Sequence, residues 1–387
     1  MGPSFSKHED FFGQLLQRRK EQHLLRMLRP HQNDFIDFSS NDYLGLARSQ
    51  ALKEQIAKEY ENAAARHVPV NGSGGSRLLS GDSVYVEDLE EKIAGNFGYA
   101  ASLFFSSGYT ANLGLFSCIA ERTDTIVFDE WAHASIRDGI RLSGARSWSF
   151  QHNDLLHLES LLRKADGKVF VAVESIYSMD GDQAPLKEIV SLCKQYHAAL
   201  IVDEAHAAGI FGENGRGLVA AENLNEEVFA CIFTFGKAFG VHGAAVAGSI
   251  ALRQYLINFS RPFIYSTAPS LHHCVAVNCA LDAVWSGNDL RQKLKEHIRY
   301  FQMRAAQTER FHFLRSDSAI QGIIIPGNEH CRHAEQVLMS DKLDVRAVLA
   351  PTVKAGAERL RINLHAFNTT QDIDLLFHAL NSASINY

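Results

Sequence analysis

The chain has 387 residues, of which 46% are hydrophobic and 21% are charged, and its formal net charge is −6. A chain of this length exceeds what one small core needs, which favours a large domain with a smaller partner domain. The charge lacks the basic excess of nucleic-acid-binding proteins, and no apolar run reaches the roughly 18 residues that span a bilayer. We therefore expect a globular protein with no nucleic-acid and no membrane partner.

The N-terminal stretch "FFGQLLQRRKEQHLLRMLR" mixes apolar and charged residues at helical spacing. It lacks the uninterrupted apolar block of a secretory signal. The six cysteines are scattered and form no CxxC pair, which is typical of a reducing compartment, so we expect a cytoplasmic protein. The closely spaced His330, Cys331 and His333, and His152 with His157, have no companions at zinc-site spacing, so we expect no metal.

From about residue 100 onward, strand-length apolar segments alternate with helical patterns. These segments are "SLFF", "TIVF", "VFVAV", "ALIV" and "CIFTF". Between two of them, the residues Leu186, Ile189, Val190, Cys193 and Tyr196 recur at the spacing of an amphipathic helix. The alternation predicts an α/β fold with a mostly parallel sheet.

After about residue 270 the pattern changes to longer helical stretches, followed by "AIQGIIIPG" and "RLRINLHAF". The last helix is expected to begin with a capping box formed by Thr369 and Asp372. We predict an N-terminal segment over 1–40, a large domain over 41–270 and a smaller C-terminal α+β domain over 271–387.

Each predicted strand is followed by residues that can carry chemistry. The segments after the strands are "SSGYTAN", "DEWAHAS", "ESIYSMDGD", "DEAHAAG" and "GKAFG". Because open parallel sheets bind ligands beyond the carboxyl ends of their strands, these segments predict one site along that edge.

The letters "VDEAH" at 202–206 also occur in nucleic-acid helicases. A helicase needs a G-x-x-x-x-G-K-[ST] loop for the nucleotide phosphates, and the sequence contains none. Binding of pyridoxal phosphate needs a lysine, a carboxylate for the pyridinium nitrogen and a phosphate cup. Lys237 in a small-residue turn, Asp203 at a strand end and Gly108 before a helix supply these groups.

Simpler structural roles remain open for each of these residues. Lys237 could be a solvated surface lysine, and Asp203 could cap the next helix. His133 and His206 could be capping or core histidines with satisfied hydrogen bonds, because an isolated histidine is usually structural.

Taken together, the motifs resemble the α-oxoamine synthases, pyridoxal-phosphate enzymes of fold type I. They are "FSSNDYLGLA", "GSGGSRLLSG", "HASIRDG", "ESIYSMDGD", "VDEAHAAGIFGENGRG", "TFGKAFG", "IYSTAP" and "PTVKAGAERLRI", and they run from Phe38 to Ile362. The resemblance implies a fold type I transferase, with a seven-stranded type of sheet in a large domain that binds pyridoxal 5'-phosphate. The chain departs from the family at Trp131, where a smaller residue is usual.

The resemblance also implies roles for matching residues. Lys237 would be the Schiff-base lysine and proton acceptor, Asp203 the partner of the pyridinium nitrogen, and His133 the stacking imidazole. The other expected cofactor contacts are Gly108, Tyr109, Ser178, His206, Thr234, Ser266 and Thr267. In the family, the stretch with the last two residues reaches the phosphate in the neighbouring subunit, which implies a homodimer with shared active sites.

Substrate contacts are implied in the same way. Asn41 and Arg361 would hold the amino-acid carboxylate, a task suited to a guanidinium, and Thr352 and Arg26 would contact the substrate. The motifs favour the branch of biotin biosynthesis that condenses L-alanine with a pimeloyl thioester, carried by CoA or an acyl carrier protein, and releases CO2 and the thiol. The alternatives are 2-amino-3-ketobutyrate ligase, 5-aminolevulinate synthase, serine palmitoyltransferase and a non-catalytic cofactor-binding regulator.

Overall fold

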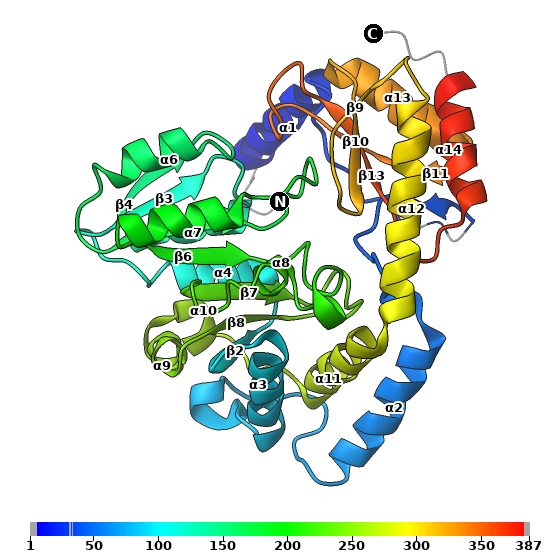
Figure 1. The fold of residues 1–387 in the computed structure, drawn as a ribbon. Coiled ribbons are helices and arrows are strands. Elements are labelled where there is room, and N and C mark those ends of the chain that lie inside the picture. The colour runs from blue at the N-terminus through cyan, green and yellow to red at the C-terminus, as the bar shows by residue number, and fades with distance from the viewer. Residues whose placement is uncertain (1–5, 31, 33, 383–387) are drawn as a thin grey trace.

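The computed structural model describes residues 6–30, 32 and 34–382, and a seven-stranded sheet forms its centre. The strand order is β2-β8-β7-β6-β5-β3-β4 (Figure 1). The strands are β2 (Ala101–Phe105), β3 (Thr125–Asp129), β4 (Arg146–Phe150), β5 (Val169–Glu174), β6 (Ala199–Asp203), β7 (Ala230–Thr234) and β8 (Ala244–Gly248). Only β8 runs against its neighbours, so the prediction of a mostly parallel sheet is confirmed.

The five strands predicted from apolar segments are all present, whereas β4 and β8 were not predicted. β4 has the sequence "RSWSF", lies at an edge of the sheet and buries only its last residue fully. β8 has the sequence "AAVAG" and is buried along its whole length. Its small residues carry little of the β-branched or aromatic signal by which strands are identified in a sequence.

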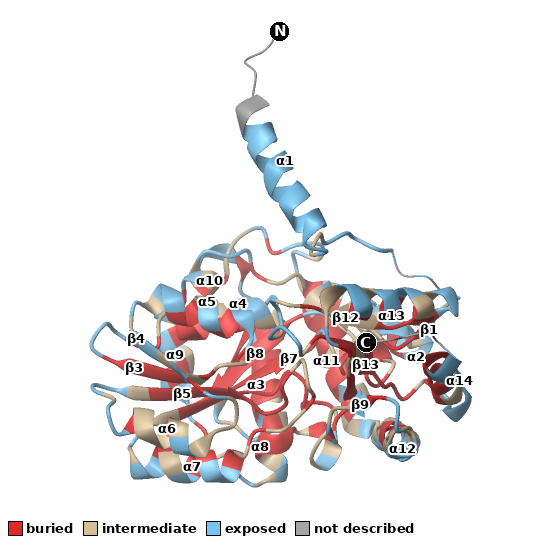
Figure 2. Cartoon of the chain, turned by 90° about the horizontal axis from the view of Figure 1, so that it is seen from above, coloured by how far each residue is buried: buried red, intermediate tan, exposed pale blue. Residues whose placement is uncertain are grey.

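Alternate residues of the strands enter two apolar layers, one on each face of the sheet. One layer is completed by α4 (Gly108–Phe116), α5 (Ala134–Ser143), α9 (Ile250–Phe259) and α10 (Arg261–Ile264). The other contains residues of α3 (Val84–Phe97), α6 (Leu155–Leu162), α7 (Leu186–Gln195), α8 (Leu218–Ala221) and α11 (Leu271–Ser286). The predicted helix is α7, and four of its five predicted apolar residues are buried. The fifth, Tyr196, lies just after the last residue of the helix and is half-buried. Figure 2 shows the buried strands between these helices.

A second, antiparallel sheet of order β12-β13-β10-β9 forms the smaller C-terminal part. Its strands are β9 (His312–Phe313), β10 (Ile320–Ile324), β12 (Arg346–Val348) and β13 (Arg359–Asn363), and its helices are α12 (Asn288–Ala306), α13 (Asn328–Ser340) and α14 (Thr370–Ser382). The capping box is confirmed: the Thr369 N–H donates to Asp372 Oδ2 and the Asp372 N–H to Thr369 Oγ1. The C-terminal α+β fold is therefore as expected, while the boundaries at 40 and 270 stay predictions.

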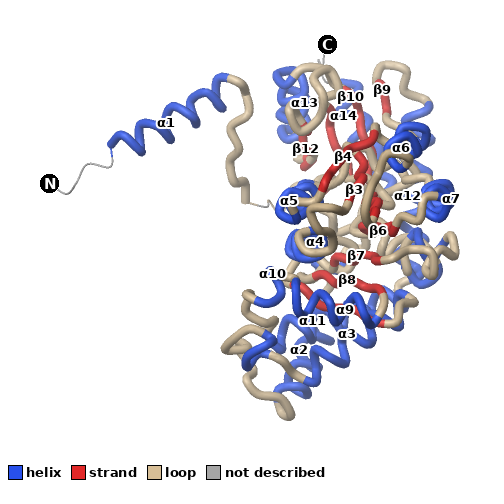
Figure 3. Tube along the Cα trace, turned by 90° about the vertical axis from the view of Figure 1, so that its left-hand side faces the viewer, coloured by secondary structure: helices blue, strands red, loops and turns tan. Residues whose placement is uncertain are grey.

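The N-terminal residues reach both parts of the molecule. β1 (Ile36–Asp37) pairs with β11 (Leu343–Asp344) beside the small sheet, and α2 (Gln50–Ala64) packs against α11. The helix α1 (Ser6–Glu21) projects from the body, as Figures 2 and 3 show, and leaves Phe11, Phe12, Leu15 and Leu16 exposed. No helix in the described ranges is long and apolar enough to cross a membrane.

Candidate functional site

A cavity of about 330 Å³ lies where several strands of the large sheet end. Lys237 follows β7, Asp203 ends β6 and His133 follows β3, and all three side chains line this cavity. Asn41, Gly108, Tyr109 and Thr234 also line it. Its volume is at the lower end of the roughly 300–1,000 Å³ found for small-molecule sites. Predicted site residues that lie far apart in the sequence are thus brought together in this cavity.

The Lys237 amine is placed to act as a nucleophile or base. Its Nζ lies 2.7 Å from His206 Nε2. Burial lowers the pKa of this amine to about 8, although the carboxylates of Asp203 and Glu174 favour the charged form. A substantial fraction of the amine is therefore neutral near physiological pH, as a nucleophilic lysine requires.

Asp203 is buried, and both of its carboxylate oxygens accept hydrogen bonds. Asn112 Nδ2 donates to Oδ2 at 2.7 Å, and the Ala205 N–H donates to Oδ1 at 2.9 Å. Asn112 also reaches the hydroxyl of Ser135, at 3.1 Å. Asn112 was not predicted, although it lies one turn after Gly108 in the quoted segment "SSGYTAN".

His133 caps a helix, which is one of the structural roles left open by the sequence, and it also lines the cavity. Its Nδ1 accepts the Ser135 N–H at 3.2 Å and so caps α5, and its ring lines the cavity. The Ser135 hydroxyl lies 2.7 Å from the same nitrogen. Burial lowers the pKa of His133, against the attraction of Asp203, and this favours a neutral imidazole that can stack on a flat ligand.

A chain of hydrogen bonds runs from His206 to β13. Tyr43 Oη lies 2.7 Å from His206 Nδ1 and donates to Asn41 Oδ1 at 3.1 Å. The same Asn41 oxygen accepts from an Nη of Arg361, at 3.1 Å. Burial, followed by the positive charge of Lys237, lowers the pKa of His206 well below its usual value, so the ring is neutral. Tyr43 was not predicted, although it belongs to the quoted motif "FSSNDYLGLA".

The cavity has features that fit pyridoxal phosphate. Gly108 begins α4, where free N–H groups favour an anion, and a Cβ atom there would lie 2.5 Å from the Thr234 methyl group. Thr234 Oγ1 and Glu174 Oε1 are buried without a hydrogen-bond partner among the described residues. Because buried polar atoms are normally paired, these two indicate a missing polar ligand.

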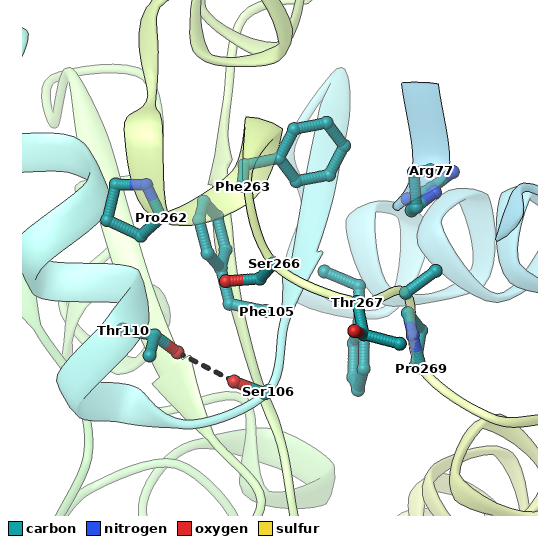
Figure 4. A pocket seen from close by; sticks show the side chains of 11 residues that line it. Arg77, Phe105, Ser106, Thr110, Pro262, Phe263, Ser266, Thr267 and Pro269 are labelled. Atoms are coloured by element: carbon teal, nitrogen blue, oxygen red, sulfur yellow. Dashed lines mark hydrogen bonds between the residues drawn. The ribbon is translucent and has the colours of Figure 1, made fainter. Parts of the chain in front are cut away.

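Seven of the predicted residues do not line this cavity, and two of them, His206 and Arg361, are joined to it by the hydrogen bonds described above. Ser266 and Thr267 line a smaller one next to it, on the segment after α10, beside Phe105 and Pro269 (Figure 4). Arg26 and Thr352 line a third cavity of about 380 Å³, together with Arg19, Met179 and Arg332. Ser178 contacts the site through its backbone, since its carbonyl accepts from Arg361 Nε at 2.7 Å.

Within the described ranges, no group of three or more His, Cys, Asp or Glu side chains is arranged to hold a metal ion. All six cysteines are free thiols, and five of them are buried.

Comparisons with known proteins agree with this geometry. The family described as aminotransferase class I and II matches residues 33–380. An 8-amino-7-oxononanoate synthase of Enterobacter sp. (strain 638) is 39% identical, with 92% of each chain covered. One of Emericella nidulans is 36% identical and covers 98% of this chain and 97% of its own.

Solved structures give the same result. An 8-amino-7-oxononanoate synthase of Francisella tularensis is 31% identical with a TM-score of 0.76, and the match covers 90% of this chain and 97% of that one. A Sphingomonas wittichii serine palmitoyltransferase is 25% identical with a TM-score of 0.86 and 98% of each chain covered. The resemblance predicted from the motifs is confirmed, and the chain belongs to the aminotransferase class I and II family, as a relative of the α-oxoamine synthases.

Proposed function

We propose that the protein is an 8-amino-7-oxononanoate synthase that condenses L-alanine with a pimeloyl thioester and releases CO2 and the thiol. The observation that carries the proposal is the shared cavity of Lys237, Asp203 and His133, which Asn41 also lines. Arg361 is joined to it through its hydrogen bond to Asn41. The identity to proteins of that name, between 36% and 39%, supports the same activity.

The residues present fit pyridoxal 5'-phosphate, which when bound supplies an electron sink for the carbon next to the amino group. Lys237 would hold it covalently, Asp203 would face its pyridinium nitrogen and His133 would stack on its ring. The N–H groups at Gly108 and Tyr109 and the unpaired hydroxyl of Thr234 would hold its phosphate.

The chain's own groups would carry the proton steps and bind the substrate. The neutral fraction of Lys237, whose pKa is about 8, would accept the α-proton of L-alanine. Arg361 and Asn41 would bind the carboxylate, and His206, held neutral and oriented by Tyr43, would keep a ring nitrogen directed at the site. Ser178 would contact the cofactor beside His206.

Substrate specificity and assembly remain part of the proposal. The cavity with Arg26 and Thr352 contains three arginine side chains, which would attract the far carboxylate of a pimeloyl group. Ser266 and Thr267 would serve the cofactor site of a second subunit in a homodimer. The exposed side chains of Tyr265 and Leu79 support a dimer, because exposed large apolar side chains are typical of an interface. Their two segments are joined by the hydrogen bond from the Ala268 N–H to the Gly75 carbonyl. The free thiols support a cytoplasmic location.

Turnover with defined substrates tests the proposed function. Purified holoenzyme is mixed with pimeloyl-CoA and either L-alanine, glycine or L-serine, and thiol release and CO2 are measured. We expect turnover with L-alanine at least about tenfold faster than with the other two, which corresponds to the discrimination that one methyl or hydroxyl group provides. The Lys237→Ala variant is the control and should release no thiol above background. Faster turnover with glycine or serine would assign the protein to another branch, and no turnover would indicate a regulator.

A further inference from the structure

His152 lies between two carboxylates that belong to two other loops. Its Nδ1 is 3.0 Å from Asp129 Oδ1, and its Nε2 is 2.7 Å from Asp182 Oδ2. Asp129 ends β3, His152 follows β4, and Asp182 lies in the loop after β5. One imidazole therefore joins three neighbouring loops at the carboxyl edge of the parallel strands. We call His152, Asp129 and Asp182 the histidine clasp.

Surrounding residues hold the clasp in one geometry. The Trp131 indole stacks on the imidazole with ring centroids 3.6 Å apart and an interplanar angle of 15°. Asn153 donates from its side chain to Asp182 Oδ2 at 2.9 Å and from its backbone to Asp129 Oδ2 at 3.0 Å. Trp131, a departure from the family pattern, thus has a defined contact. An indole face also attracts a cation, so the stack favours the charged imidazole.

The charges around His152 determine its protonation. Burial disfavours the charged form, but the hydrogen bonds that the imidazolium donates to the carboxylates of Asp129 and Asp182 outweigh it and raise the pKa of His152 to about 9. Glu130 Oε1 accepts from the backbone N–H of His152, not from its ring, at 3.4 Å, and Glu130 is itself paired with Lys354. The Tyr177 ring meets the imidazole edge-on at 4.5 Å. The clasp therefore contains an imidazolium at neutral pH.

The loops joined by the clasp position residues of the proposed site. The loop that begins at Asp129 reaches His133 four residues later, and that side chain lines the cavity. The loop with Asp182 contains Ser178, whose carbonyl accepts from Arg361 Nε. The same loop is attached to the small domain, because the Ser316 hydroxyl donates to the Gly181 carbonyl at 2.9 Å. The clasp thus connects His133 with the strand that carries Arg361.

We propose that His152 is a positioning residue that fixes the distance between His133 and Arg361 through its contacts with Asp129 and Asp182. The inference rests on the proposed function, in which His133 faces the cofactor and Arg361 binds the amino-acid carboxylate. His152 does not touch the cavity itself, since it is absent from the residues that line it. It acts by holding two loops whose separate movement would misplace both groups.

The test compares His152→Ala with the wild-type holoenzyme. The affinity for L-alanine is measured at equilibrium without thioester, from the absorbance change of the bound cofactor. We expect the affinity of His152→Ala at pH 7 to be at least about tenfold weaker, because small displacements of binding groups have effects of this size. Added imidazole, which can replace the lost ring as a cation, should restore part of the affinity at pH 7. At about pH 10 the wild-type clasp loses its own charge, so the difference between the proteins should shrink and imidazole should have no effect.

His157→Ala is the matched control, because His157 accepts the Gln151 N–H in the same segment but makes no contact with the clasp carboxylates among the described residues. It should bind L-alanine within about twofold of wild type. If His152→Ala does not fold, His152→Gln, which has donors but no charge, should weaken the affinity by about threefold, because charged hydrogen bonds are about twice as strong as neutral ones. Unchanged affinity in the His152 variant, or an equal loss in His157→Ala, would overturn the proposal.

A second readout separates this inference from the proposed function. The visible circular dichroism of the bound cofactor reports the surroundings of its ring, and it needs no substrate. We expect it to change in His152→Ala and not in His157→Ala. If the wild-type protein does not bind L-alanine but the dichroism changes as expected, the proposed function fails and the clasp stands. If L-alanine is turned over and neither readout changes, the clasp is wrong.

Discussion

Replacement of Asn112 tests whether the support of Asp203 matters for cofactor binding. Asn112 is 2% exposed and donates to the buried Asp203 carboxylate at 2.7 Å. A hydrogen bond to a charged group contributes roughly 1.5–3 kcal/mol, and 1.4 kcal/mol corresponds to a factor of ten. In Asn112→Ala, Asp203 retains only the Ala205 N–H. A carboxylate that has lost a donor is held less firmly in place and is therefore a weaker partner for a pyridinium. We expect the dissociation constant of pyridoxal phosphate to rise by about 10- to 150-fold.

The assay is equilibrium binding of pyridoxal phosphate to cofactor-free protein, followed by absorbance at neutral pH. Asn225→Ala is the control. The Asn225 side chain also donates one partly buried hydrogen bond, to the Phe97 carbonyl at 2.8 Å, but Asn225 does not line the cavity. It should change the dissociation constant by less than about twofold. A value for Asn112→Ala that matches this control would refute the assignment of Asn112 as the support of Asp203.

Three further changes have expected outcomes. Tyr43→Phe removes the hydroxyl group next to the buried His206 Nδ1, so the free energy of unfolding measured by urea denaturation should fall by about 1–3 kcal/mol. A change below about 0.5 kcal/mol would contradict the hydrogen bond between Tyr43 and His206. Gly108→Ala places a Cβ 2.5 Å from the Thr234 methyl group. Pyridoxal phosphate should therefore bind more weakly than to wild type, whereas the affinity for pyridoxal without phosphate should fall less. Equal losses of affinity for the two compounds would argue against a phosphate cup. The pKa of His152 is raised to about 9, so its contribution to the stability of the fold is complete below about pH 6.5 and is lost as the pH rises through 9. The difference in unfolding free energy between wild type and His152→Gln should therefore be larger at pH 6 than at pH 10. A constant difference would disprove the charged clasp.

Much of the architecture follows from local sequence patterns. Segments such as "VFVAV" and "ALIV" became the buried strands β5 and β6, because runs of β-branched and apolar residues leave few other ways to bury that surface. The polar residues after those strands could then be expected at one edge, since parallel strands end side by side. Lys237, Asp203 and His133 were identified for this reason, together with their motifs, and they do share one cavity. β8 was missed because its small residues carry no such pattern.

The partners of these residues were decided only by the tertiary structure. Asn112 is 91 positions from Asp203, and Tyr43 is 163 positions from His206. No local periodicity connects such pairs, because their contacts depend on how whole strands and domains pack. The protonation states follow the same rule: burial lowers the pKa of Lys237 and two carboxylates from other loops raise that of His152, and neither environment exists until the chain has folded. Local side-chain chemistry thus predicts which groups are available, whereas packing across the sheet determines which of them meet and which charge they carry.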